Sequence, residues 1–382
     1  MPEFFIASHE FPPQHGGIAT FTLEVVRALH GKGATIHLLV PQDCALPNAF
    51  VSNPQVPLEM EKLPIASTHG IAATWGMAKA LKRHEAALQD AVLLITEPGP
   101  IRALYLAVRY LGLTIPRFRV VVHGSELIRG LRSPFWRHPV RFALQEAEMV
   151  ATVSRYNASI LAEKYGIRED AVVILPLAVS SELRGASSPS APLPQAGEGR
   201  LRLITVARLH PRKGQDRVLR ALRQLPAEIR GRIEYHIVGA GRSRRFQQQL
   251  AALAGKCGVP VVFAGALDTR GLVAAYRQAD LFILTSGPHR SSVEGFGLVY
   301  IEANYFGLPV IGTRTGGTGD AIVDGQTGLL LEEDSASVIA AAIACLVNHT
   351  ELRKKLGERG QIVAKARSWR TVAEQLTASP PQ

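Results

Sequence analysis

The chain has 382 residues, of which 47% are hydrophobic and 20% are charged. That length suits two domains of ordinary size, and the apolar share is too high for an intrinsically disordered protein. The net charge of +11 favours an anionic partner, which composition alone leaves open as a nucleic acid, an acidic lipid surface or a phosphorylated substrate.

The sequence lacks the usual marks of a secreted or membrane-spanning protein. Its three cysteines, Cys44, Cys257 and Cys345, form no C-x-x-C pair, so neither a disulfide framework nor a zinc site is predicted. The N-terminal stretch MPEFFIASHEF lacks the regions of a signal peptide, and no apolar run reaches about 18 residues. We therefore expect a cytoplasmic location, either free or peripheral on the inner face of the cell membrane.

In the first half of the chain, short apolar runs alternate with longer helical patterns. FFIAS is followed by a glycine-rich loop and by ATFTLEVVRALHGKG, which has the spacing of a helix that ends at glycine. The later runs TIHLLV, VLLIT, RVVVHG, MVATVS and AVVILP are typical of strands. Ser154 is predicted to cap the helix that follows MVATV. This alternation predicts a parallel sheet with helices on both faces.

Residues 181–200 interrupt the alternation. The stretch SELRGASSPSAPLPQAGEGR is rich in Ser, Pro, Gly and Ala and is typical of an exposed linker. Strand patterns then resume with RLITVAR, EYHIVGAG, PVVFAG, LFILTS and PVIGT. The sequence therefore predicts an α/β protein with two doubly wound domains, residues 1–180 and 201–365, whose ligands should bind at the carboxyl ends of the strands.

The loop after LFILTS places two acids around a glycine-rich turn, VEGFGLVYIE. A helix is expected to begin near Gly297, which would leave the backbone N–H groups of Phe296, Gly297 and Leu298 free to bind phosphate oxygens. Glu294 lies just before this helix and Glu302 about one turn inside it, where carboxylates can accept hydrogen bonds from sugar or ribose hydroxyls. Taken alone, this motif favours the simpler explanation that Glu294 is an acid at the start of a helix that interacts with the helix dipole.

A second loop, VARLHPRKGQD, follows the strand pattern RLITVAR. It places Arg208 and Lys213 where two cations can neutralise a departing diphosphate, although a solvated basic loop is the simpler alternative. GAGRSR, which begins at Gly239, imitates a dinucleotide fingerprint but has Arg244 in place of the third glycine. A tight turn near a nucleotide is therefore predicted there, rather than a nicotinamide site.

Together these motifs resemble the GT-B glycosyltransferases of family 4. The Arg208–Lys213 pair, IVGAG, FAGAL, the Glu294–Glu302 pair and GGTGDAIVDGQTGLLL occur in that family's order and spacing. PPQHGGIATF and VVHGSE resemble its N-terminal glycine loop and a strand-end histidine. The resemblance covers nearly the whole chain. It implies two Rossmann-like domains that face each other across a cleft, with a C-terminal helix, about residues 366–382, that returns to the first domain.

The resemblance also implies a role for each matching position. Arg208 and Lys213 would hold the phosphates of a nucleotide-sugar donor, Glu302 the ribose and Glu294 the donor sugar, while His123 would contact the sugar near the reacting carbon. The other expected contacts with the donor come from Gly16 and Gly17 of the first domain, from Gly239, Phe296, Gly297 and Leu298, and from Gly265 to Leu267 at the base. Transfer in this family retains the anomeric configuration and needs no cofactor or metal ion, which agrees with the lack of an Asp-x-Asp cluster in the sequence.

The motifs RKGQD, VEGFGLVYIEA and GGTGDAIVDGQTG are most similar to bacterial α-mannosyltransferases that act on phosphatidylinositol mannosides and related lipids. The expected donor is therefore GDP-mannose, with a UDP-hexose as the alternative, and the expected acceptor is a lipid-linked or glycan molecule. A nucleic-acid-binding protein would also explain the charge, but no recognised binding motif occurs and the cations are spread over both domains, so no nucleic acid is expected.

Residues 128–142, IRGLRSPFWRHPVRF, interleave arginines with Phe135 and Trp136. Basic residues mixed with interfacial aromatic residues suit docking on anionic lipid headgroups. The alternative is a partly buried aromatic loop with arginines on its surface.

Overall fold

The computed structural model describes residues 3–14, 16–47, 50, 55–67, 70–186, 199–287 and 292–380. It divides the chain into two compact units, Met1–Leu177 together with Ser368–Gln382, and Ala178–Arg367. Most of the predicted linker, residues 187–198, lies outside the described residues. The predicted start of the linker at residue 181 is wrong, because Ser181–Gly185 form helix α8 within the second unit. The Ser180 hydroxyl caps this helix, and Leu183 is buried.

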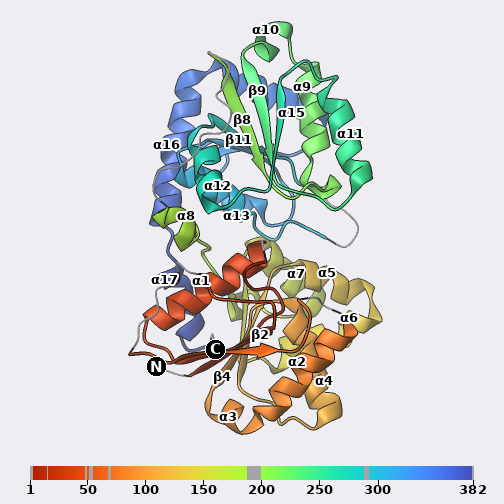
Figure 1. The fold of residues 1–382 in the computed structure, drawn as a ribbon, viewed down its shortest axis with the longest axis vertical. Helices are drawn as coiled ribbons and strands as arrows, with labels where there is room; N and C mark the ends of the chain where they lie inside the picture. Colours follow the sequence, from red (N-terminus) through yellow and green to blue (C-terminus); the bar gives the residue numbers. More distant parts are fainter. Residues whose placement is uncertain are drawn as a thin grey trace. The chain divides into compact units, whose positions relative to one another are not determined.

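Seven parallel strands form the sheet of the first unit, in the order β3-β2-β1-β4-β5-β6-β7. Two of them, β2 and β4, are labelled in Figure 1. The neighbours β1 and β4 are far apart in sequence, because the chain winds outward from β1 in both directions. The prediction of a doubly wound α/β fold is confirmed. The strands are β1 Phe4–Ala7, β2 Ile36–Pro41, β3 Leu58–Leu63, β4 Val92–Ile95, β5 Phe118–Val122, β6 Met149–Thr152 and β7 Val172–Ile174.

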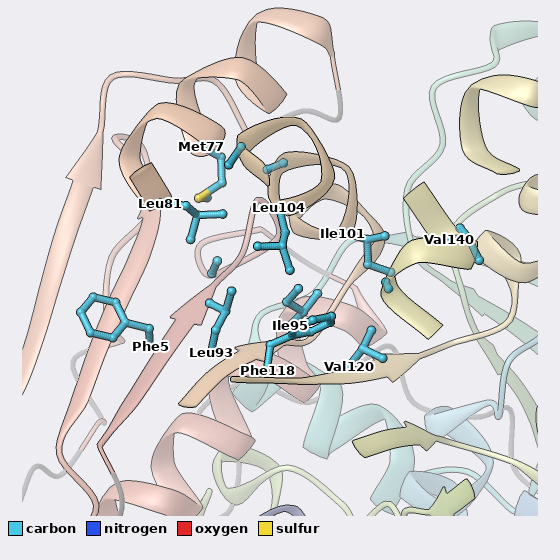
Figure 2. Close-up of a cluster of buried hydrophobic side chains, with 14 of the residues drawn as sticks. Phe5, Met77, Leu81, Leu93, Ile95, Ile101, Leu104, Phe118, Val120 and Val140 are labelled. Carbon is cyan, nitrogen blue, oxygen red and sulfur yellow. The ribbon is translucent and has the colours of Figure 1, made fainter. Parts of the chain in front are cut away.

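Helices α2 (Ile71–Arg83), α4 (Pro98–Leu111) and α6 (Pro134–Glu146) bury an apolar face against this sheet. Figure 2 shows Met77 and Leu81 of α2 and Leu104 of α4 beside Leu93 and Ile95 of β4, and all five side chains are fully buried. The two β4 residues lie two apart, so they point to the same face of the sheet. Each such side chain contributes about 1.5–3 kcal/mol of hydrophobic free energy when it leaves water.

The end of the chain is part of the first unit. Helix α17 (Trp369–Thr377) packs on α1 (Gly17–Gly31), where the Trp369 ring lies edge-on to Phe21 with centroids 5.8 Å apart. The guanidinium of Arg119, on β5, donates hydrogen bonds to the carbonyls of Leu376 and Ala378. The remaining helices of this unit are α3 Glu85–Asp90, α5 Ser125–Arg132 and α7 Arg155–Tyr165. As predicted, Ser154 caps α7, since its hydroxyl accepts from the Asn157 N–H.

Six parallel strands form the sheet of the second unit, in the order β10-β9-β8-β11-β12-β13. Here β8 and β11 are the neighbours at which the winding reverses, and this switch point is where ligands bind in such sheets. The strands are β8 Leu201–Val206, β9 Ile233–Val238, β10 Val261–Gly265, β11 Leu281–Leu284, β12 Val310–Thr313 and β13 Gly328–Leu331. The helices that follow α8 are α9 Gln215–Gln224, α10 Ala227–Arg230, α11 Arg244–Ala254, α12 Thr269–Arg277, α13 Leu298–Tyr305, α14 Thr318–Ala321, α15 Ala336–Asn348 and α16 Thr350–Ala366.

Two strands, β3 and β13, were not among the predicted strand runs. Each is paired on one side only in its sheet, and β3 carries Glu59, Glu61 and Lys62, which makes it unlike the buried apolar runs used to find the others.

Across the described ranges, the structure has no helix long and apolar enough to cross a membrane.

Candidate active site

The loops after β8 and β11 meet at the switch point of the second unit. Gly214 ends the first loop with φ +77°, and a Cβ atom there would lie 2.2 Å from the Thr285 carbonyl oxygen, so glycine is required at this close approach. The Gly287 N–H donates to the Arg212 carbonyl over 2.8 Å. The two loops predicted to carry the site are therefore packed directly against each other.

Glu294 is buried, and one of its carboxylate oxygens is surrounded by donors. Oε2 accepts hydrogen bonds from Lys213 Nζ (2.6 Å), from an Arg212 guanidinium nitrogen (3.0 Å) and from the Ser286 hydroxyl (2.9 Å). Burial alone would raise the pKa of Glu294, but the charges of Lys213 and Arg212 and the hydrogen bonds outweigh it and lower this pKa to about 2. No described residue donates to Oε1, which leaves a charged acceptor for a ligand hydroxyl.

The sequence prediction missed two members of this cluster, Arg212 and Ser286. Arg212 directly precedes Lys213, and nothing in the sequence shows that its side chain is the more buried of the two. Ser286 is the final residue of the run LFILTS, so its position at the carboxyl end of β11 was the available signal.

The turn between Glu294 and α13 presents backbone donors, as predicted. Gly297 precedes α13 with φ +92°, and within the described part of the chain the N–H groups of Phe296, Gly297 and Leu298 have no acceptor. The Phe296 ring is buried beneath the Arg367 guanidinium, 5.4 Å from the ring centroid. The side chain thus anchors the turn while its amides remain available to phosphate oxygens.

A second glycine turn supports Glu294 from behind. Gly316 has φ +56°, and a Cβ atom there would lie 2.1 Å from the Glu294 carbonyl oxygen. That oxygen accepts a hydrogen bond from the Gly317 N–H over 2.8 Å. The segment GGTGD is therefore part of the scaffold that fixes the carboxylate.

Glu302 lies inside α13 in a different environment. The Tyr276 hydroxyl donates to its Oε2 over 2.9 Å. Burial raises the pKa of Glu302 to about 7, and the Tyr276 hydrogen bond offsets only part of that rise. The two glutamates are thus distinct chemically: Glu294 is a permanent anion, whereas Glu302 changes protonation near neutral pH.

The other predicted residues of the second unit lie along the same edge of the sheet. Arg208 is exposed, and its carbonyl accepts from the Gln215 side chain over 2.9 Å. The Gly239 N–H donates to the Gly265 carbonyl over 2.7 Å, and a Cβ atom at Gly239 would lie 2.0 Å from the Ala207 carbonyl oxygen. Leu267 follows β10, just before Asp268, which caps α12. The structure therefore gathers these positions around the carboxyl ends of β8, β9 and β10.

In the first unit, His123 follows β5 and Gly16 and Gly17 begin α1. The His123 Nε2 atom lies 2.8 Å from the Thr96 carbonyl oxygen, its backbone N–H donates to the Glu126 carboxylate, and Phe21 of α1 meets its ring edge-on at 5.0 Å. Gly16 and Gly17 are exposed, and Gly16 has an extended backbone that leaves space beside it. Their roles toward a donor stay predictions.

Residues 128–142 form parts of α5 and α6 rather than a loop, which corrects the loop alternative. Pro134 occupies the first turn of α6, where its missing N–H costs nothing. Arg102 of α4 lies over the rings of Phe135 and Trp136, at 4.5 Å and 5.0 Å from their centroids, and Arg129 lies over Trp136. Phe135 remains 59% exposed.

Among the residues that the structure describes, no group of three or more His, Cys, Asp or Glu side chains is placed to hold a metal ion.

Two doubly wound sheets, with a carboxylate pair and a basic loop at the switch point of the second, agree with the GT-B fold of glycosyltransferases. Residues 194–363 match the family model described as Glycosyl transferases group 1, and residues 15–183 match Glycosyltransferase Family 4. The chain belongs to this family and is a hexose-transferring enzyme, so the predictions of family and enzyme class are confirmed.

The chain is similar to curated proteins and to solved structures, some of which match nearly all of it. The GDP-mannose-dependent alpha-(1-6)-phosphatidylinositol monomannoside mannosyltransferase of Mycobacterium tuberculosis is 27% identical over 98% of this chain and 97% of its own length. The protein of the same name from Mycolicibacterium smegmatis is 32% identical over 66% of this chain and 67% of its own length. Sucrose-phosphate synthase from Thermosynechococcus elongatus shares the fold, with a TM-score of 0.78 at 18% identity over 98% of this chain and 97% of that one.

Proposed function

We propose that the protein transfers mannose from GDP-mannose to a lipid-linked or glycan acceptor, with retention of anomeric configuration and without a metal ion. The names of the Mycobacterium tuberculosis and Mycolicibacterium smegmatis relatives support the donor and the lipid acceptor. A UDP-hexose donor is the alternative. The acceptor serves the synthesis of a cell-envelope glycolipid or polysaccharide.

The observation that carries this proposal is the pair of buried glutamates, each held by the protein through Oε2. Among the described residues, neither Glu294 nor Glu302 receives a hydrogen bond at Oε1. Glu302 would accept from a ribose hydroxyl and Glu294 from a hydroxyl of the donor sugar. The amides of Phe296, Gly297 and Leu298 between them would receive the pyrophosphate.

The reaction places new charge on the leaving phosphate, because the glycosidic bond stretches before the acceptor bonds. Lys213 donates one N–H to Glu294 and has two more for phosphate oxygens, while Arg208 is exposed on the same loop. Cations fixed in this way bind the charged transition state more strongly than the ground state. His123, Gly16 and Gly17 would contact the donor sugar from the first unit.

The acceptor proposal includes docking on an anionic membrane through residues 128–142. Arg132, Arg137 and Arg141 are exposed on α5 and α6 beside the exposed Phe135. Arginine and an aromatic ring together suit the headgroup region of a bilayer.

Calorimetry with GDP, UDP and ADP, in the presence of a metal chelator, tests the donor site. We expect GDP to bind most tightly and Glu302→Ala to abolish that binding. Preferential binding of UDP would select the alternative donor, and equally weak binding of all three would contradict the site.

A transfer assay tests the reaction itself. GDP-mannose with a phosphatidylinositol mannoside acceptor should release GDP only when the acceptor is present, and proton NMR of the product should show an α linkage. An epimerase or a phosphorylase of the same architecture would not show this acceptor dependence.

A further inference from the structure

Tyr276 connects α12 to the nucleotide site from inside the second unit. Its side chain is fully buried, and its ring stacks on Phe306 at 5.3 Å between centroids with an interplanar angle of 12°. A tyrosine so held has little freedom to redirect its hydroxyl. That hydroxyl lies 2.9 Å from Glu302 Oε2.

The hydrogen bond from Tyr276 restricts the orientation in which the Glu302 carboxylate can bind a ligand. A carboxylate held at neither oxygen can rotate about its terminal bond, since that torsion has a broad energy minimum. With Oε2 bound to Tyr276, rotation of the carboxylate is restricted, and Oε1 receives no hydrogen bond from the described residues. A fixed acceptor loses less conformational entropy when a hydroxyl binds to it.

We propose that Tyr276 is a positioning residue for nucleotide recognition: its hydroxyl holds one oxygen of Glu302 and presents the other to a ribose hydroxyl. This inference rests on the proposed function, because it takes Glu302 as the ribose acceptor. Tyr276 itself does not touch the nucleotide.

The ionisation of Glu302 should make nucleotide affinity depend on pH. Burial raises the pKa of Glu302 to about 7 and the Tyr276 hydroxyl lowers it; among the described residues, no charged side chain contributes. Ribose hydroxyls donate to the ionised carboxylate, so nucleotide affinity should rise as pH increases through about 7. Removal of the Tyr276 hydroxyl would raise the pKa of Glu302 further and move this rise in affinity to higher pH.

The test is the affinity for GDP from pH 6 to pH 9 in the wild-type enzyme and in Tyr276→Phe. We expect binding about tenfold weaker at pH 7 in the variant, with the midpoint of the pH dependence shifted upward. Tyr235→Phe is the matched control, because Tyr235 is also fully buried in this unit but its hydroxyl contacts Thr205 (2.7 Å) instead of Glu302. A midpoint that is the same in Tyr276→Phe as in wild type would overturn the inference.

Glu302→Gln separates this inference from the function on which it rests. The variant should bind GDP weakly, and any pH dependence that remains would belong to the nucleotide itself. If Glu302→Gln binds GDP like the wild type, the ribose role of Glu302 is wrong and the positioning role fails with it. If Glu302→Gln weakens binding while Tyr276→Phe leaves the pH profile unchanged, the proposed function stands and only the role of Tyr276 fails.

Discussion

At the scale of single residues, two glutamates eight positions apart have opposite ionisation behaviour. Both are buried, which by itself disfavours the charged form. The positive charges of Lys213 and Arg212 offset the burial of Glu294, whereas among the described residues the Glu302 carboxylate receives a hydrogen bond from the neutral Tyr276 hydroxyl alone. The first carboxylate therefore strengthens the fold near neutral pH, and the second weakens it.

Replacement of Glu302 by glutamine should stabilise the free enzyme. The pKa of Glu302 is about 7 in the folded protein and 4.5 for a glutamate in water, so the folded state loses stability as pH rises from about 4.5 to 7. We expect Glu302→Gln to raise the free energy of unfolding by roughly 2–3 kcal/mol at pH 8 and to change it little at pH 4. Urea unfolding at both pH values measures this. A gain of the same size at pH 4 and pH 8 would show that the stabilisation has another origin.

Two arginines of the loop after β8 should have different roles, Arg212 in stability and Arg208 in transfer. Arg212→Met removes a buried partner of Glu294 and should cost about 2 kcal/mol of stability. Arg208→Met changes an exposed side chain, so stability should stay within about 0.5 kcal/mol of wild type. Transfer by Arg208→Met should nevertheless fall by about 10²–10³-fold, because a charge that faces the leaving phosphate is lost. Thermal unfolding measures the effect on stability, and initial rates measure the effect on transfer. An Arg208→Met variant with normal rates would exclude Arg208 from the phosphate site.

At the scale of elements, the active site depends on turns that only glycine can form. Gly297 and Gly316 both have positive φ, and each would bring a Cβ atom into another part of the site, the Tyr300 ring and the Glu294 carbonyl oxygen respectively. The turn that presents the amides and the turn that supports Glu294 are thus interlocked through backbone atoms.

Gly316→Ala should therefore damage nucleotide binding as well as stability. An alanine at positive φ costs about 1 kcal/mol, and the clash with Glu294 must in addition displace the backbone of the site. Gly325→Ala is the control, because Gly325 has φ +67° with open space around its Cβ position. We expect both variants to lose stability but only Gly316→Ala to lose GDP affinity in calorimetry. Equal GDP affinity in the two variants would refute the supporting role of Gly316.

Several elements were predictable from the sequence because their signals are local. The apolar runs located the central strands, and the Gly-Phe-Gly turn located the start of α13 within one residue. Tyr276 could not be connected to Glu302 in the same way, because the contact joins two helices across 26 positions. The loop alternative for residues 128–142 is wrong, because Pro134 fits the first turn of α6 and Val140 anchors that helix to the buried core.

At the scale of the whole molecule, the net charge of +11 does not by itself identify a binding surface, but two exposed aromatic residues mark surfaces that can be compared. Phe135 lies among the arginines of α5 and α6 in the first unit, whereas the exposed Phe263 belongs to β10 of the second unit. In the proposed docking, charge would draw the protein toward an anionic surface, and an inserted ring would then fix its orientation.

Vesicle binding should distinguish these two aromatic residues. We expect co-sedimentation with vesicles that contain phosphatidylinositol but not with pure phosphatidylcholine, and release in 0.5 M salt at a Debye length of roughly 4 Å. Phe135→Ser should weaken this binding several-fold, and Phe263→Ser should leave it unchanged. Equal effects of the two substitutions would reject residues 128–142 as the docking surface.

The return of the chain to its first unit has a consequence for synthesis. Helix α17 packs on α1, although residues 32–368 separate them along the chain and all of the second unit lies between. A ribosome that adds roughly 5–20 residues per second delivers Trp369 some 10–40 s after residue 177. At the end of that interval the second unit, which is continuous in sequence, is fully synthesised, while the surface of α1 around Phe21 still lacks its cover. The unit whose synthesis begins first is therefore the last to be completed.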